Sequence, residues 1–149
     1  MSFVYPNSLD TFSQSDPNEI EAVMFFIHAL EKRGLITRGS SARKATCMYG
    51  FKHAAEDFYS GLRELGLNSF VGHIHYESAA VACKKSHYDI KRPNDGDFNA
   101  DGWYNYIAMM KIKTGKYRNL GREIAEEVVQ AYKFTIELQD IRRTVYEKS

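Results

Sequence analysis

Residues 16–34 read DPNEIEAVMFFIHALEKRG, and this stretch carries the clearest fold signal in the chain. The opening Asp-Pro pair suits the N-cap and first position of a helix, and Glu19 can close a capping box. Gly34, followed by a leucine, is typical of a helix end. The apolar residues between them recur at helical spacing, and they are Ile20, Val23, Met24, Ile27 and Leu30. The pattern predicts a helix over residues 17–33.

Three further segments downstream show the same periodicity. Residues 42–65 repeat apolar side chains on one stripe, although Gly50 inside this run costs about 1 kcal/mol against alanine and favours a kink or a break. Residues 103–110 form an i, i+3, i+4, i+7 stripe with Asp101 as the expected N-cap. Residues 120–146 are apolar on two sides, which is typical of the central helix of a bundle.

Residues 67–78 allow two interpretations. The stretch Phe70–Glu77 alternates like a strand, whereas one helix over residues 68–86 fits the composition equally well, and so few residues do not separate the two. A turn-rich loop is expected from Lys91 to Gly102. The sequence therefore predicts a mainly α fold, an irregular bundle of four to five helices, with a possible short strand or hairpin around 67–78. Residues 1–15 form an expected lead-in arm, and 16–149 a single helical domain.

Composition limits the class of protein. The chain has 149 residues, of which 44% are hydrophobic and 26% charged, an ordinary globular balance. Cys47 and Cys83 form no CxxC motif, and the N-terminus has no apolar leader segment. No window reaches the roughly 18 apolar residues that a membrane span requires. These features predict a cytoplasmic protein with reduced thiols and no membrane partner, and they do not set its oligomeric state.

The charges are distributed in blocks, although the net charge is only +1. Residues 32–52 carry six basic residues and no acid, and residues 111–122 carry five basic residues and no acid. Both blocks lie at predicted helix junctions, where the backbone N–H groups of a helix N-terminus can also stabilise a bound anion. The alternative is that the blocks are solvated loops that complement acidic helices of the same molecule. The candidate residues for binding an anion or a partner are Arg38, Arg43, Lys44, Lys111, Lys113, Lys116 and Arg118.

Two segments contain residue types that bind metals, although no cofactor is predicted outright. On a strand, His73, His75 and Glu77 would share one face and could ligate a transition metal; on a helix, His73 and Glu77 would still be neighbours. Asp97, Asn99 and Asp101 followed by glycine match the front half of a calcium loop, but Ala108 stands where a bidentate acid belongs. The alternatives are a hydrogen-bonded polar edge and a polar loop.

One more pair has metal-site spacing. His53 and Glu56 lie three residues apart on the predicted 42–65 helix, as in carboxylate-bridged metal bundles. Such a site would need acids from another helix, and the sequence offers Glu123, Glu126 and Glu127.

No complete catalytic set is visible, and no serine stands in a G-x-S-x-G motif. The sequence therefore favours a non-enzymatic binding, regulatory or accessory protein. Its charged faces would act on nucleic acid or on a nucleic-acid-handling protein. The alternative is a small metal-dependent hydrolase or nucleotide-processing enzyme that uses His73, His75 and Glu77.

Overall fold

The computed structural model describes residues 3–4, 15–39, 46–67, 72–93, 107–113 and 119–147. Within these ranges the fold is mainly helical, with a few short strands in two small sheets. The helices are α1 (Pro17–Lys32), α2 (Met48–Glu64), α3 (Tyr76–Lys85) and α4 (Leu120–Glu147). The strands are β1 (Phe3–Val4), β2 (Ile36–Arg38), β3 (Thr46–Cys47), β4 (Ile90–Pro93), β5 (Ile107–Ala108) and β6 (Met110–Ile112).

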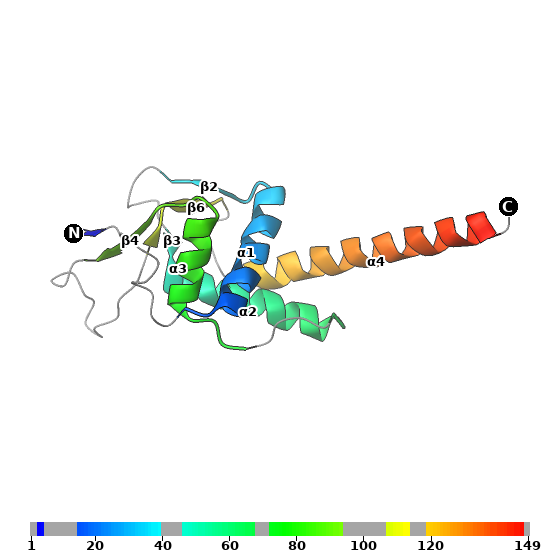
Figure 1. Cartoon of the computed structure of the whole chain (residues 1–149), viewed down its shortest axis with the longest axis horizontal. Coiled ribbons are helices and arrows are strands. Elements are labelled where there is room, and N and C mark those ends of the chain that lie inside the picture. Colours follow the sequence, from blue (N-terminus) through cyan, green and yellow to red (C-terminus); the bar gives the residue numbers. More distant parts are fainter. Residues whose placement is uncertain are drawn as a thin grey trace.

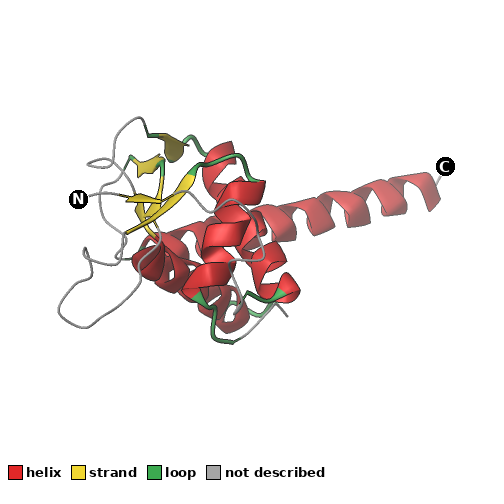
Figure 2. Ribbon diagram, turned by 60° about the vertical axis from the view of Figure 1, so that its left-hand side comes forward, coloured by secondary structure: helices red, strands yellow, loops and turns green. Residues whose placement is uncertain are grey.

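The helices pack around one apolar core, and the strands gather at one end of it (Figure 1). One sheet has the strand order β1-β4-β5-β3, and β2 pairs with β6 in the second. The first half of α4 packs mainly against α2, whereas its second half extends away from the body as a lone helix (Figure 2). This extension corrects the expected central role of α4, because only its first three turns bury side chains.

The helix predicted over residues 17–33 is confirmed as α1. The Asp16 side chain accepts hydrogen bonds from the backbone N–H groups of Asn18 and Glu19, at 2.9 and 3.2 Å. Gly34 has a φ of +64°, a conformation that glycine adopts without a Cβ penalty, and Leu35 N–H donates to Leu30 O across the helix end. The capping box is only half formed, because Asp16 N–H donates to Ser78 Oγ rather than to Glu19.

The prediction of a helix over residues 103–110 is wrong where the structure describes it, since Ile107–Ala108 and Met110–Ile112 are strands. The apolar residues there also fit a period of two, with Ala108, Met110 and Ile112 buried and Lys111 exposed between them. Pairing with β2, β3 and β4 supplies the backbone hydrogen bonds and selects the strand. The proposed N-cap, Asp101, lies outside the described residues.

Three boundaries also differ from the prediction. Residues 46–47 form β3, so α2 begins at Met48 and Gly50 lies in its first turn, where a glycine interrupts little. In the described part of 67–78 there is no strand, since residues 72–75 have no regular secondary structure and α3 begins at Tyr76. The expected loop from Lys91 contains the last three residues of β4, which pair with β1 and β5. In each case a tertiary partner decides the local structure.

Two glycines allow α2 and α4 to cross closely. A Cβ on Gly61 would lie 2.9 Å from Ala125 Cβ. A Cβ on Gly121 would lie 2.7 Å from Phe58 N and closer still to Ala54 O. The two helices therefore meet backbone to backbone, and this contact sets the direction in which α4 leaves the body.

The two cysteines are free and differ in environment. Cys83 is fully buried, and its burial raises the pKa of the thiol, as expected for an inert core cysteine. Cys47 is only partly buried. None of the helices in the described ranges is long and apolar enough to cross a membrane.

Candidate functional site

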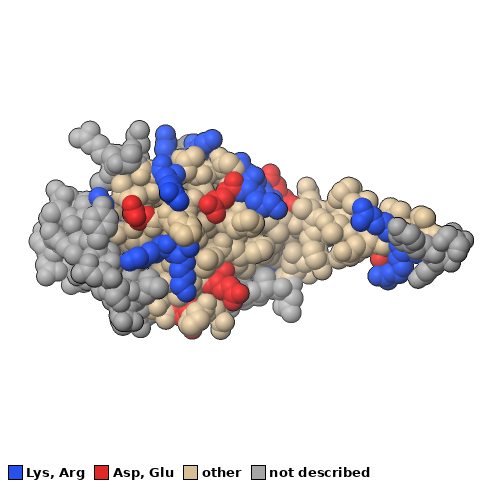
Figure 3. Space-filling view, turned by 45° about the horizontal axis from the view of Figure 1, so that its top comes forward, with Lys and Arg blue, Asp and Glu red and all other residues tan. Residues whose placement is uncertain are grey.

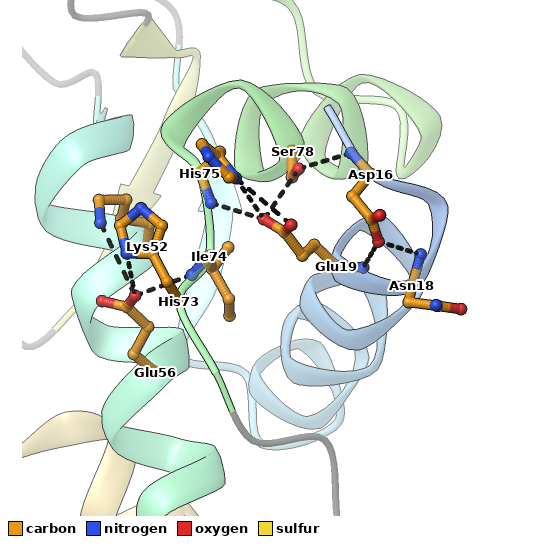
Figure 4. A network of polar contacts seen from close by, with 9 residues as sticks. All are labelled: Asp16, Asn18, Glu19, Lys52, Glu56, His73, Ile74, His75 and Ser78. Carbon is orange, nitrogen blue, oxygen red and sulfur yellow. Dashed lines mark hydrogen bonds and ion pairs between the residues drawn. The ribbon is translucent and has the colours of Figure 1, made fainter. Parts of the chain in front are cut away.

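A partly buried polar network holds the segment that leads into α3. Residues 72–75 have no regular secondary structure, and two carboxylates bind them from either side, Glu19 from α1 and Glu56 from α2 (Figure 4). Each carboxylate accepts one backbone N–H of this segment, and each lies beside one histidine ring, 3.1 Å from His75 Nδ1 for Glu19 and 3.3 Å from His73 Nδ1 for Glu56. The network therefore joins three helices through charged groups.

Glu19 is the more buried of the two carboxylates. Its Oε1 accepts from His75 N–H at 2.6 Å, lies 3.1 Å from His75 Nδ1 and accepts from Ser78 Oγ at 3.2 Å. Ser78 in turn accepts from Asp16 N–H at 3.0 Å. Hydrogen bonds to a charged acceptor are stronger than neutral ones, and they stabilise a buried carboxylate that would otherwise be costly. Glu19 thus ties the start of α1 to the start of α3.

Glu56 gathers three basic side chains around it. His73 Nδ1 lies 3.3 Å and Lys52 Nζ 3.7 Å from Glu56 Oε2, and His53 Nδ1 lies 2.8 Å from Oε1. Ile74 N–H donates to Oε2 at 2.8 Å. Lys52 is almost wholly buried and also lies over the ring of Tyr49. His53 and Glu56, which have metal-site spacing, lie in contact on α2, whereas Glu123, Glu126 and Glu127 do not join them.

The predicted ligand set of His73, His75 and Glu77 is distributed differently from either sequence interpretation. His73 lies against Glu56 and His75 against Glu19, with the two imidazole rings 4.8 Å apart between centroids. Glu77 is buried in the first turn of α3. In the part of the chain that the structure describes, no three His, Cys, Asp or Glu side chains are grouped to hold a metal ion. Asp97, Asn99 and Asp101 lie outside it, so the calcium hypothesis stays a prediction.

The two basic sequence blocks meet at the β2–β6 sheet. Thr37 pairs with Lys111 and Arg38 with Met110, and the pairing continues to Lys113, whose N–H donates to Leu35 O at 2.8 Å. Alternation along the strands buries Ile36, Met110 and Ile112 on one face and leaves Thr37, Lys111 and Lys113 on the solvent face. Arg38 pairs with Met110 and is exposed at the end of β2, on the other face of the sheet from the two lysines. The exposed basic residues Arg38, Lys111 and Lys113 are hereafter called the basic edge.

Other basic residues of the same blocks are neutralised within the molecule. Arg33 Nε lies 2.6 Å from Glu127 Oε2, and Arg122 Nη2 lies 2.7 Å from Glu64 Oε2. Lys52 is buried beside Glu56. These three residues are therefore paired with acids of the same molecule, although Lys52 and Arg122 lie in helices rather than in solvated loops. Figure 3 shows Lys and Arg side chains in several groups over one face of the body, with Asp and Glu between them.

The charge of Arg38 acts on the buried aromatic residue Tyr88. Tyr88 Oη donates to Glu31 Oε2 at 3.1 Å. Burial, this hydrogen bond and the charge of Glu31 raise the pKa of Tyr88 to about 12, and the charge of Arg38 acts in the opposite direction. Among the described residues, no ion pair joins Arg38, Lys111 or Lys113 to an acid. The other predicted anion-binding residues, Arg43, Lys44, Lys116 and Arg118, lie outside the described residues.

Sequence reasoning did not identify Glu19 and Glu56 as partners of the histidines. Glu19 was assigned to the helix cap, yet it neighbours Ile20 on the buried side of α1, where an isolated carboxylate requires partners. That burial signal was available from the helical periodicity. The periodicity did not identify its partner, His75, which lies 56 residues away in the sequence.

Comparisons with known proteins add no relative, because no family model, curated protein or solved structure matches this chain.

Proposed function

We propose that this protein is a non-enzymatic binding protein and that the basic edge holds the phosphate backbone of a nucleic acid. The observation that carries the proposal is the β2–β6 pairing. It brings together basic residues of two blocks, Arg38 and Lys111, that are more than 70 positions apart in the sequence, and it leaves Arg38, Lys111 and Lys113 exposed. Exposed lysine and arginine side chains neutralise phosphates and release counterions, which supplies most of the affinity in sequence-independent binding.

The proposal predicts a steep dependence on salt. Duplex DNA should bind with a log–log slope of about −0.9 per phosphate contact, so three contacts give roughly −3. Reversing Lys111 and Lys113 to glutamate should abolish binding without unfolding the protein, because both side chains are exposed. Fluorescence anisotropy with labelled DNA, over a series of salt concentrations, measures both effects.

A matched control is available on α4. Lys133→Glu with Arg143→Glu makes the same change in net charge at two exposed positions away from the basic edge, and it should retain most of the binding. Equal loss in the two double variants would show that only net charge matters. If the wild type binds no nucleic acid near physiological salt, the proposal is overturned. The basic edge should then be tested in pull-downs against an acidic, nucleic-acid-handling protein.

A second candidate function is hydrolysis, and the paired histidines favour it. His73 and His75 are partly exposed, with side chains 62% and 41% accessible, and a carboxylate holds Nδ1 of each ring. A carboxylate beside an imidazole orients the ring, as in general-base pairs. In the metal-dependent form of this hypothesis His73, His75 and Glu77 would ligate the ion.

We expect the metal-dependent form to fail an elemental test. Purified protein should contain no near-stoichiometric zinc, iron, nickel or manganese, and EDTA should leave the melting temperature unchanged, because a natively bound ion would stabilise the fold. A stoichiometric metal that is lost in His73→Ala and His75→Ala, but kept in the exposed-site control His28→Ala, would contradict this expectation and favour the enzyme.

A further inference from the structure

The second half of α4 presents large apolar side chains to solvent. Every side chain described from Gln130 to Val145 is exposed, and the helix extends beyond the body in both views (Figure 1, Figure 2). Phe134, Ile141 and Val145 are 61%, 59% and 61% exposed. Apolar side chains gathered in this way mark surfaces that another molecule covers.

The exposed residues follow a heptad pattern. Positions a and d are occupied by apolar side chains alternately three and four residues apart, which together form an apolar stripe: Ala131, Phe134, Leu138, Ile141 and Val145. The stripe spans 15 residues, or about 22 Å of helix. Tyr132 and Ile136 are also exposed, but they lie on the opposite side of α4 from the stripe. This is the side on which Val129, nearer the body, packs into the core.

The first part of the stripe borders the end of α1. An open groove between the two helices is lined by Lys32, Arg33, Glu127, Gln130, Ala131 and Phe134. Ala131 and Phe134 belong to the stripe, and Arg33 is held in place by its ion pair with Glu127. The groove therefore offers an apolar wall on one side and a basic helix end on the other.

We propose that a second copy of this chain covers the apolar stripe, with its α4 running antiparallel to the first. In this register Phe134 packs against Val145 of the second copy and Leu138 against Ile141, so that four of the five stripe residues pair with one another and Ala131 lies beyond the last layer. The same contacts recur after a two-fold rotation, as a closed homodimer requires. The stripe is thus complementary to itself, and a single surface suffices for both partners.

The antiparallel direction follows from the groove. In a parallel pair the two α1 ends, each with Lys32 and Arg33, would meet at the same level of the stripe. In the antiparallel pair they lie at opposite ends. Each groove then receives the last turn of the partner's helix, whose carbonyl end is partially negative and complements Lys32.

The flanking charges do not oppose this direction. In the antiparallel register Glu137 lies beside Thr144 of the second copy and Arg142 beside Thr135, so that like charges do not meet. A parallel pair would place Glu137 beside Arg142 of the second copy, but an exposed ion pair of this kind contributes little. The stripe is short, yet packing of the first half of α4 on α2 already forms the helix and lowers the cost of ordering it. The dimer should consequently depend on protein concentration.

Sedimentation velocity of the full chain, over a wide range of concentration, tests the association. Wild type should shift from monomer toward dimer as concentration rises. Ile141→Glu should remain monomeric, while Ile136→Glu, the same change on the other side of the same helix, should dimerise like wild type. A wild type that stays monomeric throughout, or an equal loss in both variants, would overturn the proposal.

Oxidative cross-linking tests the direction. A mixture of Phe134→Cys and Val145→Cys should form a disulfide between the two variants. Val145→Cys alone should form none, because two such residues would lie 11 positions apart along the pair, or about 16 Å. Wild type, which retains Cys47 and Cys83, is the control for background oxidation. A disulfide in Val145→Cys alone would overturn the antiparallel arrangement.

Discussion

Replacing Gly121 with alanine should lower the free energy of unfolding by about 3 kcal/mol, at the upper end of the range for overpacked cores. The added Cβ would lie 2.7 Å from Phe58 N and closer still to Ala54 O. Both atoms belong to the backbone of α2, so that no side-chain rotation relieves the contact. The helices must move apart instead, and the close packing around Leu120 and Ala125 is lost with them.

Chemical denaturation followed by circular dichroism measures this effect. Gly34→Ala is a useful comparison, because no atom lies within 4 Å of the added Cβ and only the left-handed backbone is strained. The free energy of unfolding of that variant should fall by about 1–2 kcal/mol. If Gly121→Ala lowers the free energy of unfolding no more than Gly34→Ala does, the close crossing of α2 and α4 is incorrect.

Replacing Glu19 with alanine should lower the free energy of unfolding by a similar amount, about 3 kcal/mol, because it leaves buried donors without an acceptor. The backbone N–H of His75 and the hydroxyl of Ser78 would both lose their partner. The segment before α3 would also lose one of the two carboxylates that hold it, which should increase amide hydrogen exchange at Ile74 and His75.

Two variants separate this role from a general effect of charge. Glu21→Ala removes the same residue type from the exposed side of the same helical turn, and it should change stability by no more than about 0.5 kcal/mol. Glu19→Gln retains an acceptor oxygen, and its free energy of unfolding should fall less than that of Glu19→Ala. Equal stabilities of Glu19→Ala and Glu21→Ala in thermal and chemical unfolding would contradict the network.

Local signals in the sequence were sufficient for α1 and α4. Asp16, Pro17 and Gly34 act on neighbouring residues, so the boundaries of α1 follow from capping chemistry that needs no tertiary partner. Residues 107–112 were misassigned for the opposite reason. Ile107 and Met110 fit a helical spacing, whereas Ala108, Met110 and Ile112 fit a period of two, and only the distant strands β2, β3 and β4 make the extended form favourable.

The candidate sites divide in the same way. The two basic blocks are visible in the sequence, but their meeting at Arg38, Lys111 and Lys113 requires the β2–β6 pairing. His73 and His75 attract attention by their spacing, yet their carboxylates come from α1 and α2, at positions that no local pattern connects to them.

The sequence by itself determined the helical class, the capped start of α1, the length of α4 and the block distribution of charge. These properties depend on residues within a few positions of one another. Only the tertiary structure decided which charges are neutralised, which carboxylates hold His73 and His75, and which side of α4 remains uncovered. Those outcomes depend on contacts between residues far apart in the chain, and such contacts follow from how whole elements pack together.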